Sequence, residues 1–207
     1  MDVFQAMTEM RAMRRIKPDA VPRAEIEDLI RYATHAPSGS NSQGWRFVVV
    51  TDAAMRKEIG AIYGRAVDIY LKTINTKPEA HQTQGEWERL IASVRWQGDH
   101  MGEIPVHIFP CLTSAPAAAF ANPLVAKALA GSIYPAIQNM LLAARAKGLG
   151  ATLTTLHLMF DAEVNALLKL PERASTFALI PVGYPMGKFG PTKRLPVADL
   201  IGWDGWE

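Results

Sequence analysis

A polar, glycine-bearing loop that opens straight into a short apolar strand is the feature that most constrains this chain. The loop covers residues 36–44, and the run Trp45–Val50 that follows is almost continuously apolar and rich in β-branched residues. Such a run is typical of a strand buried in a sheet. In the loop, Pro37 fixes the backbone at the start, and Gly39 can adopt conformations that other residues rarely reach. Loops of this type either connect two elements or bind anions and cofactors through free amides.

Apolar periodicity predicts helices on both sides of this loop. Asp2 is expected to cap a first helix, with an apolar face, that ends by residues 14–18. A second helix is expected over residues 23–36, and Asp52 is expected to cap a third that begins near Ala53. Further helices are expected around 86–96, 133–144 and 161–168, and further strands at 106–112, 151–154 and 177–182.

The boundaries of the later helices rest on single residues. Ser132 stands at the expected start of a strongly apolar helix, and Gly148 and Gly150 are expected to stop it. Asp161 is expected to cap the helix that runs through Leu168. Strands interleaved with helices predict an α+β fold, an α/β sandwich. The length of 207 residues and 49% hydrophobic content fit one domain over residues 1–207.

Composition excludes several classes of function. The 22 basic and 20 acidic residues leave a net charge of +2, which does not provide the broad basic surface that nucleic acid requires. The single cysteine, Cys111, allows no internal disulfide and no thiol pair for a metal, and the histidines show no paired ligand spacing. No signal peptide and no membrane-spanning apolar run is visible, so the protein is expected to be cytoplasmic and not membrane-bound.

Basic residues gather near both ends of the chain. Arg11, Arg14, Arg15 and Lys17 lie close together, and the tail GPTKRLP contains Arg194. Guanidinium groups bind phosphate bidentately, so arginines that converge from separate segments would form a clamp for a phosphate. The alternative is that arginines at a helix end cap carbonyl groups in solvent.

Four blocks of the sequence, taken in order, resemble the FMN-dependent nitroreductase family. They are MRAMRRIKPDAVP, APSGSNSQGWRFVVV, GLGATLTTL and ALIPVGYPMGKFGPTKRLP. The resemblance implies a nitroreductase-like α+β fold, with a central, mostly antiparallel sheet flanked by helices. It also implies a homodimer in which each C-terminal segment wraps onto its partner. The expected cofactor is FMN, with NADH or NADPH as hydride donor and a small-molecule electron acceptor as the second substrate.

The resemblance also assigns cofactor-binding residues, while no side chain is expected to be catalytic because the chemistry belongs to flavin N5. Arg11, Arg14 and Arg194 would hold the phosphate, with Arg14 also a candidate for the cation beside the flavin pyrimidine ring. Pro37, Ser38, Gly39 and Asn41 would contact the flavin, in part across the dimer interface, and Gln43 and Trp45 would anchor that loop. Ser132 would face the ribityl chain, and the backbone of Leu153, Thr154 and Thr155 would pass behind the ring.

The first of these blocks departs from the family pattern. Met10 stands where the family has an arginine, and Ala12 stands at a cofactor-binding position where the family has a serine. One phosphate ligand and one hydroxyl are therefore missing, and Arg15 or Lys17 is available to compensate.

Trp203 and Trp206 stand near a chain end that would ordinarily fray. Burying a large apolar side chain is worth about 1.5–3 kcal/mol, so both are expected to dock on a protein surface. That surface is either the same subunit or, as the resemblance implies, the dimer partner.

The predicted function is that of a nitroreductase, which transfers hydride through flavin N5, in a ping-pong cycle, to nitroaromatics, quinones or other flat acceptors. Tyr70, Trp96 and Phe120 are candidates to line the acceptor site, although a structural role is the more common one for such aromatic residues. The alternatives are a flavin-binding carrier or sensor without turnover, and a specialised ene-reductase or dehalogenase of the same family.

Overall fold

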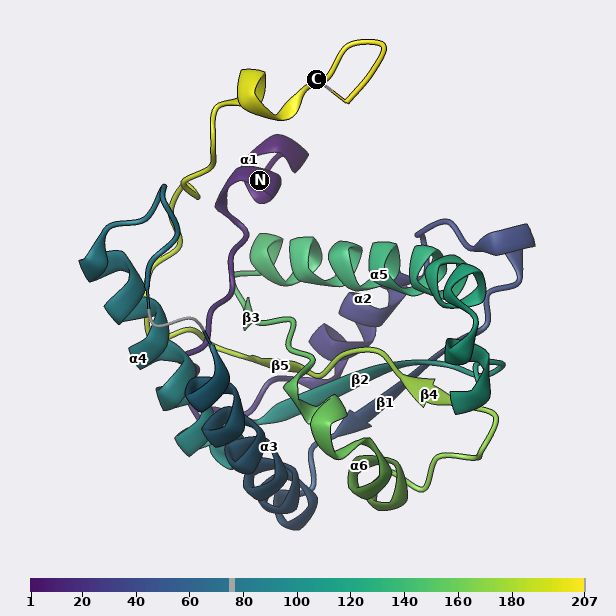
Figure 1. Ribbon diagram of the computed structural model, residues 1–207. Helices are drawn as coiled ribbons and strands as arrows, with labels where there is room; N and C mark the ends of the chain where they lie inside the picture. Colours follow the sequence, from purple (N-terminus) through teal and green to yellow (C-terminus); the bar gives the residue numbers. More distant parts are fainter. Residues whose placement is uncertain (75–76, 207) are drawn as a thin grey trace.

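The computed structural model describes residues 1–74 and 77–206 as an antiparallel sheet with helices on both faces (Figure 1). The helices are α1 Val3–Glu9, α2 Arg23–Ala33, α3 Ala53–Thr73, α4 Gln84–His100, α5 Pro123–Ala146 and α6 Asp161–Leu167. The strands are β1 Trp45–Val50, β2 Val106–Leu112, β3 Gly150–Ala151, β4 Ser175–Thr176 and β5 Ile180–Gly183. The α+β class is confirmed, and β1 and β2 have the predicted bounds.

The sheet order is β1-β2-β5-β3, with β4 paired to β2, and every pairing is antiparallel. Side chains alternate along β2, so Ile108 packs into one apolar cluster and Phe109 into the other. The first cluster lies under α2 and α5, and the second lies under α3, α4 and α6. This burial on both faces explains why β2 is apolar at almost every position.

The first helix differs from the prediction. Asp2 does cap it, accepting a hydrogen bond from the Gln5 amide at 2.8 Å, but α1 ends at Glu9 and Met10 is extended. Its apolar face is not packed in the described chain: Phe4 is 75% exposed and Met7 52% exposed, whereas Ala6 is buried. The helix and its Asp2 cap are as predicted, whereas the helix ends earlier and its apolar face is largely exposed.

Helix α5 begins earlier than its apolar stripe suggested. Asn122 caps it through the Leu124 amide and Pro123 occupies its first turn, so Ser132 lies within the helix and is not its N-cap. The end is as expected at Gly148, which has φ +75° and follows a Schellman pattern in which the Leu149 amide donates to Ala144. Gly150 is not a stop signal, since it belongs to β3.

Helix α6 also has a different cap from the predicted one. Asp161 is its first residue, and its Oδ2 accepts from Asn165 Nδ2 at 2.8 Å instead of capping the backbone. The preceding Phe160 makes no side-chain cap. Cys111 is buried under this helix layer, and burial raises the pKa of its thiol to about 12.

Candidate functional site

Arg14 lies in a cavity of about 210 Å³ between the N-terminal segment, α3, α4 and the segment after β3. The segment that carries Arg14 is fixed on both sides, because the Met13 amide donates to Ala151 and Ile16 forms a bridge with Pro185. The lining residues are Arg14, Tyr63, Tyr70, Val94, Gln97, Thr152, Leu153, Thr154, Thr155 and Leu156. The structure thus brings Arg14 together with the predicted Leu153, Thr154 and Thr155.

The charge of Arg14 has no carboxylate partner within residues 1–74 and 77–206. Its Nη1 makes one long hydrogen bond of 3.4 Å to Ser93 Oγ. Burial lowers the pKa of this guanidinium, which shows that the fold disfavours its charged form. A buried cation without a counter-ion is costly, so the cavity is suited to an anionic or strongly polar ligand.

Pro181 explains why the backbone that lines this cavity is not fully paired with the neighbouring strand. Gly150 pairs with Gly183 and Thr154 bridges Leu179, and the same register places Thr152 opposite Pro181. Proline has no N–H to donate to the neighbouring strand. The β3–β5 ladder is therefore interrupted at Thr152 and Leu153, which shortens the strand predicted for 151–154 to Gly150–Ala151.

A hydroxyl relay orients a buried amide toward the cavity. The Tyr63 hydroxyl lies 3.0 Å from Thr154 Oγ1 and donates to Gln97 Oε1 at 3.4 Å. Since Tyr63 has one proton to give, the Thr154 hydroxyl donates to Tyr63. Gln97 Nε2 and Thr152 Oγ1 are buried without a hydrogen-bond partner in the described chain, and both residues line the cavity. Each side chain is only 1% exposed.

Tyr63, Gln97 and Thr152 were not among the residues predicted from the sequence. Gln97 was detectable in principle, since it is three positions after Val94 on the buried face of α4, where an apolar residue is expected. Tyr63 gives no comparable signal, because a tyrosine on an apolar helix face is ordinarily part of the core.

The predicted loop residues form a second group, around Ser132. The Gly39 amide donates to Ser132 Oγ at 3.1 Å, and Trp45 Nε1 donates to the Ser132 carbonyl at 2.8 Å. The Gln43 amide donates to Ser38 Oγ at 3.1 Å, so Gln43 and Trp45 anchor the loop in this structure. Pro37, Ser38, Gly39 and Asn41 are thereby held against the middle of α5.

The backbone of this loop corrects one expectation. Gly39 does not occupy the left-handed region, whereas Ser40, Asn41 and Gln43 do, with φ of 54°, 52° and 49°. Non-glycine residues pay for that conformation, and asparagine tolerates it best. The strain is therefore in the polar residues, and the amide of Gly39 contributes by reaching Ser132.

The two groups lie well apart in one chain. Arg145, near the end of α5, forms an ion pair with Glu9, just before the Arg11–Arg14 segment. Ser132 precedes Arg145 by 13 positions on the same helix, which corresponds to about 20 Å at the helical rise per residue. The cavity around Arg14 accordingly includes no residue of the loop.

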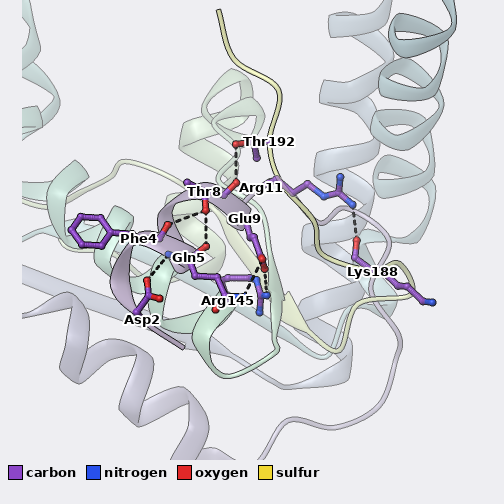
Figure 2. Close-up of polar contacts among 9 residues, drawn as sticks. All are labelled: Asp2, Phe4, Gln5, Thr8, Glu9, Arg11, Arg145, Lys188 and Thr192. Carbon is purple, nitrogen blue, oxygen red and sulfur yellow. Dashed lines mark hydrogen bonds and ion pairs between the residues drawn. The ribbon is translucent and has the colours of Figure 1, made fainter. Parts of the chain in front are cut away.

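Arg11 and the C-terminal tail are adjacent, as Figure 2 shows. Arg11 Nη2 donates to the Lys188 carbonyl at 2.6 Å, and the Thr192 amide donates to the Thr8 carbonyl at 2.9 Å. Arg145 stacks over the Phe189 ring, 4.2 Å from its centroid. This contact joins Arg11 to the tail through a backbone carbonyl, and the convergence of Arg11, Arg14 and Arg194 on one phosphate stays a prediction.

The remaining predicted residues make fewer contacts in the described chain. Arg194 is exposed and donates only to the neighbouring Lys193 carbonyl, and Ala12, Arg15 and Lys17 are exposed. Of the aromatic candidates, Tyr70 lines the Arg14 cavity, whereas Trp96 stacks on His100 at 4.4 Å and Phe120 packs against Phe177 at 5.6 Å. In the described ranges, no cluster of histidine, cysteine and acidic side chains could hold a metal. The described helices likewise include none long and apolar enough to cross a membrane.

Comparison with known proteins agrees with this geometry. The model of the nitroreductase family matches residues 8–184. A NADH dehydrogenase of Thermus thermophilus is 31% identical over 98% of this chain and 96% of its own length. An iodotyrosine deiodinase of Daphnia pulex is 27% identical over 97% of this chain, which spans only 65% of that protein.

Solved structures show the same fold. A putative NADH dehydrogenase/NAD(P)H nitroreductase of Parabacteroides distasonis superposes with a TM-score of 0.63 at 25% identity, covering 99% of this chain and 98% of its own. An oxidized iodotyrosine deiodinase bound to FMN and 3-iodo-L-tyrosine superposes with a TM-score of 0.71 at 22% identity, covering 100% of both chains.

Proposed function

Because this chain belongs to the nitroreductase family and is an NAD(P)H-dependent flavin oxidoreductase, we propose that it binds FMN as a homodimer and reduces nitroaromatics, quinones or related flat acceptors. Residues 1–207 would form a single FMN-binding domain. The observation that carries the proposal is the Arg14 cavity, where a half-buried cation and two buried polar atoms without a partner in the described chain, Gln97 Nε2 and Thr152 Oγ1, surround one space.

These residues fit the polar edge of a flavin. Gln97 Nε2 and Thr152 Oγ1 each have a proton to donate and no acceptor among the described residues, and Arg14 makes a single long hydrogen bond there, to Ser93 Oγ. The pyrimidine ring of a flavin presents carbonyl oxygens and gains negative charge on reduction, so it would supply the missing acceptors. A plain structural cavity would be lined by apolar groups and would not hold a cation.

When bound, FMN would supply the redox chemistry, taking a hydride at N5 from NADH or NADPH and passing electrons to the acceptor in a ping-pong cycle. The chain's own residues would hold and tune it. Arg14 would stabilise negative charge at the pyrimidine edge, and the Leu153–Thr155 backbone, which begins where Pro181 interrupts the ladder, would lie behind the ring. Arg11 and Arg194 would bind the phosphate.

A homodimer would complete the site. The loop at Ser132 and the cavity at Arg14 are separated along α5, and a two-fold axis would place the loop of one subunit beside the cavity of the other. The C-terminal segment supports this arrangement. In Figure 1 it extends beyond α1, away from the sheet, and Trp203 and Trp206 are 83% and 100% exposed.

The first prediction concerns turnover. The purified protein should be yellow, and anaerobic NADH or NADPH should bleach it, with colour restored by a nitroaromatic or a quinone. Stopped-flow absorbance near the flavin band measures both half-reactions separately. A yellow dimer that neither nicotinamide bleaches would instead indicate the carrier or sensor function.

Reductive dehalogenation is a second candidate, favoured by the similarity to iodotyrosine deiodinases over nearly the whole chain. The same flavin site would serve, with a halogenated aromatic in place of the nitro compound. Product analysis with matched nitro, quinone, alkene and halogenated aromatic acceptors separates these reactions. Release of halide at a rate above that of nitro reduction would favour dehalogenation.

The second prediction concerns Gln97. Replacing it with leucine removes a donor that the apo fold leaves unpaired and an acceptor of the Tyr63 hydroxyl, which can donate to Thr154 Oγ1 instead, so the stability of the apo protein should change little. If Gln97 donates to the flavin, the Kd for FMN should rise about fivefold to tenfold, the equivalent of one hydrogen bond. Quenching of FMN fluorescence measures this Kd.

Gln84→Leu provides the control, since Gln84 is exposed at the start of the same helix. It should leave the Kd unchanged. An unaltered FMN Kd in Gln97→Leu would remove Gln97 from the proposed site.

A further inference from the structure

A second cavity, of about 420 Å³, lies between the start of β1 and the loop that follows α6. It shares no lining residue with the Arg14 cavity. Its floor is apolar and includes Val48, Leu168 and the buried Cys111. Its volume lies within the range of about 300–1,000 Å³ typical of small-molecule sites.

The rim of this cavity is cationic. Arg46, Lys169 and Arg173 come from two separate segments, and the lining contains no acidic residue. Within the part of the chain that the structure describes, none of the three side chains makes an ion pair or a hydrogen bond. Some other cations of the described chain are paired with carboxylates, as Lys147 is with Glu25 and Asp28.

The backbone at Lys169 adds an independent observation. Lys169 follows α6 at the position where helices usually place glycine, and it has φ 53°. The Leu170 amide donates to Asn165 at 2.9 Å, which completes the helix-ending motif around a lysine. A side chain at this position strains the backbone, so the chain keeps a cation where glycine would fold more easily.

We propose that this cavity binds a small anion with an apolar body, and that a phosphate monoester is the preferred head group. The apolar floor would take the body, while the guanidinium groups of Arg46 and Arg173 and the ammonium group of Lys169 bind the oxyanion. Three cations favour a dianion over a monoanion, since each added charge strengthens the attraction. The site is separate from the flavin site and does not depend on the proposed function.

The test uses the FMN-loaded protein and phenyl phosphate as the probe. Isothermal titration calorimetry should show one phenyl phosphate per chain, bound at least tenfold more tightly than inorganic phosphate, which lacks the body. Benzoate, which has a similar body and one charge, should bind more weakly than phenyl phosphate. Equal affinities for phenyl phosphate and inorganic phosphate would overturn the assignment of the apolar floor.

Variants locate the binding. The double variant Arg46→Ala/Arg173→Ala should weaken phenyl phosphate binding at least tenfold without loss of FMN. Glu172→Gln changes a charge in the same loop but outside the lining, so it should not weaken binding. Binding that survives the double variant unchanged would place the ligand elsewhere and overturn the proposal.

Lys169→Gly separates binding from folding. Glycine relieves the backbone strain, so the Tm should rise by about 2–4 °C, while phenyl phosphate binding should weaken about fivefold. A gain in Tm with unchanged binding would remove Lys169 from the site. A lower Tm would contradict the proposed backbone strain at Lys169.

Discussion

Replacing Arg14 with alanine is expected to give a folded but largely colourless protein. The guanidinium is half-buried without a carboxylate partner in the described chain, and desolvation lowers its pKa, so its removal relieves the apo fold of an unfavourable charge. The same change removes the cation from the flavin site. Charge-assisted hydrogen bonds contribute about 1.5–3 kcal/mol each, so a bidentate contact corresponds to a loss of FMN affinity of at least about 100-fold.

Two measurements check this prediction together. The FMN Kd should rise steeply, while the Tm of the apo protein should stay the same or increase. Arg23→Ala is the control for loss of one positive charge, because Arg23 is exposed and paired only with Glu27 on α2. Full FMN occupancy in Arg14→Ala would mean that the cavity does not hold the cofactor. A collapse of the apo Tm would mean that Arg14 is structural.

Replacing Trp203 and Trp206 together with serine is expected to dissociate the proposed dimer. Both side chains are almost fully exposed in the described chain, and tryptophans buried at an interface commonly dominate its energy. Each would contribute about 1.5–3 kcal/mol on burial, so the dimer Kd should rise at least about 100-fold. Sedimentation velocity over a range of protein concentrations measures the shift.

The same variant tests whether the flavin needs both subunits. FMN should be lost in step with the dimer, although Arg14 and Gln97 are untouched. Met159→Ser is the control, since Met159 is 46% exposed near α6 and far in sequence from the tail. A double tryptophan variant that remains a dimer with full FMN would show that the tail docks on its own subunit or on nothing.

The sequence predicted the elements whose signals are local. β1 and β2 have the expected bounds because long apolar runs between polar loops leave little choice. Gly148 was identified as a helix end because its positive φ is a backbone requirement that glycine meets. Ser132 was misplaced within α5 because the Ala- and Pro-containing segment before it shows no clear stripe, and tertiary contacts extend the helix through it.

The residues of the sequence motifs in the candidate site could be predicted, whereas the residues that pack behind them could not. Arg14 and Thr154 belong to blocks that resemble the family, and the cavity brings them together. The Tyr63–Gln97 relay depends on where α3 and α4 cross behind the β3 segment, which no local pattern encodes. The sequence also predicted an unusual backbone conformation at Gly39. In the structure, the left-handed conformation is found at Ser40, Asn41 and Gln43 instead.

The stretch of α5 between Ser132 and Arg145 separates the two halves of the proposed site, so flavin binding would depend on the concentration of the protein itself. If each prosthetic group rests on two polypeptides, subunit association and cofactor retention become one linked equilibrium. Dilution would then release flavin, and added flavin would draw monomers together. At low expression the protein would persist as an inactive, colourless pool that scarce riboflavin derivatives recruit into working pairs.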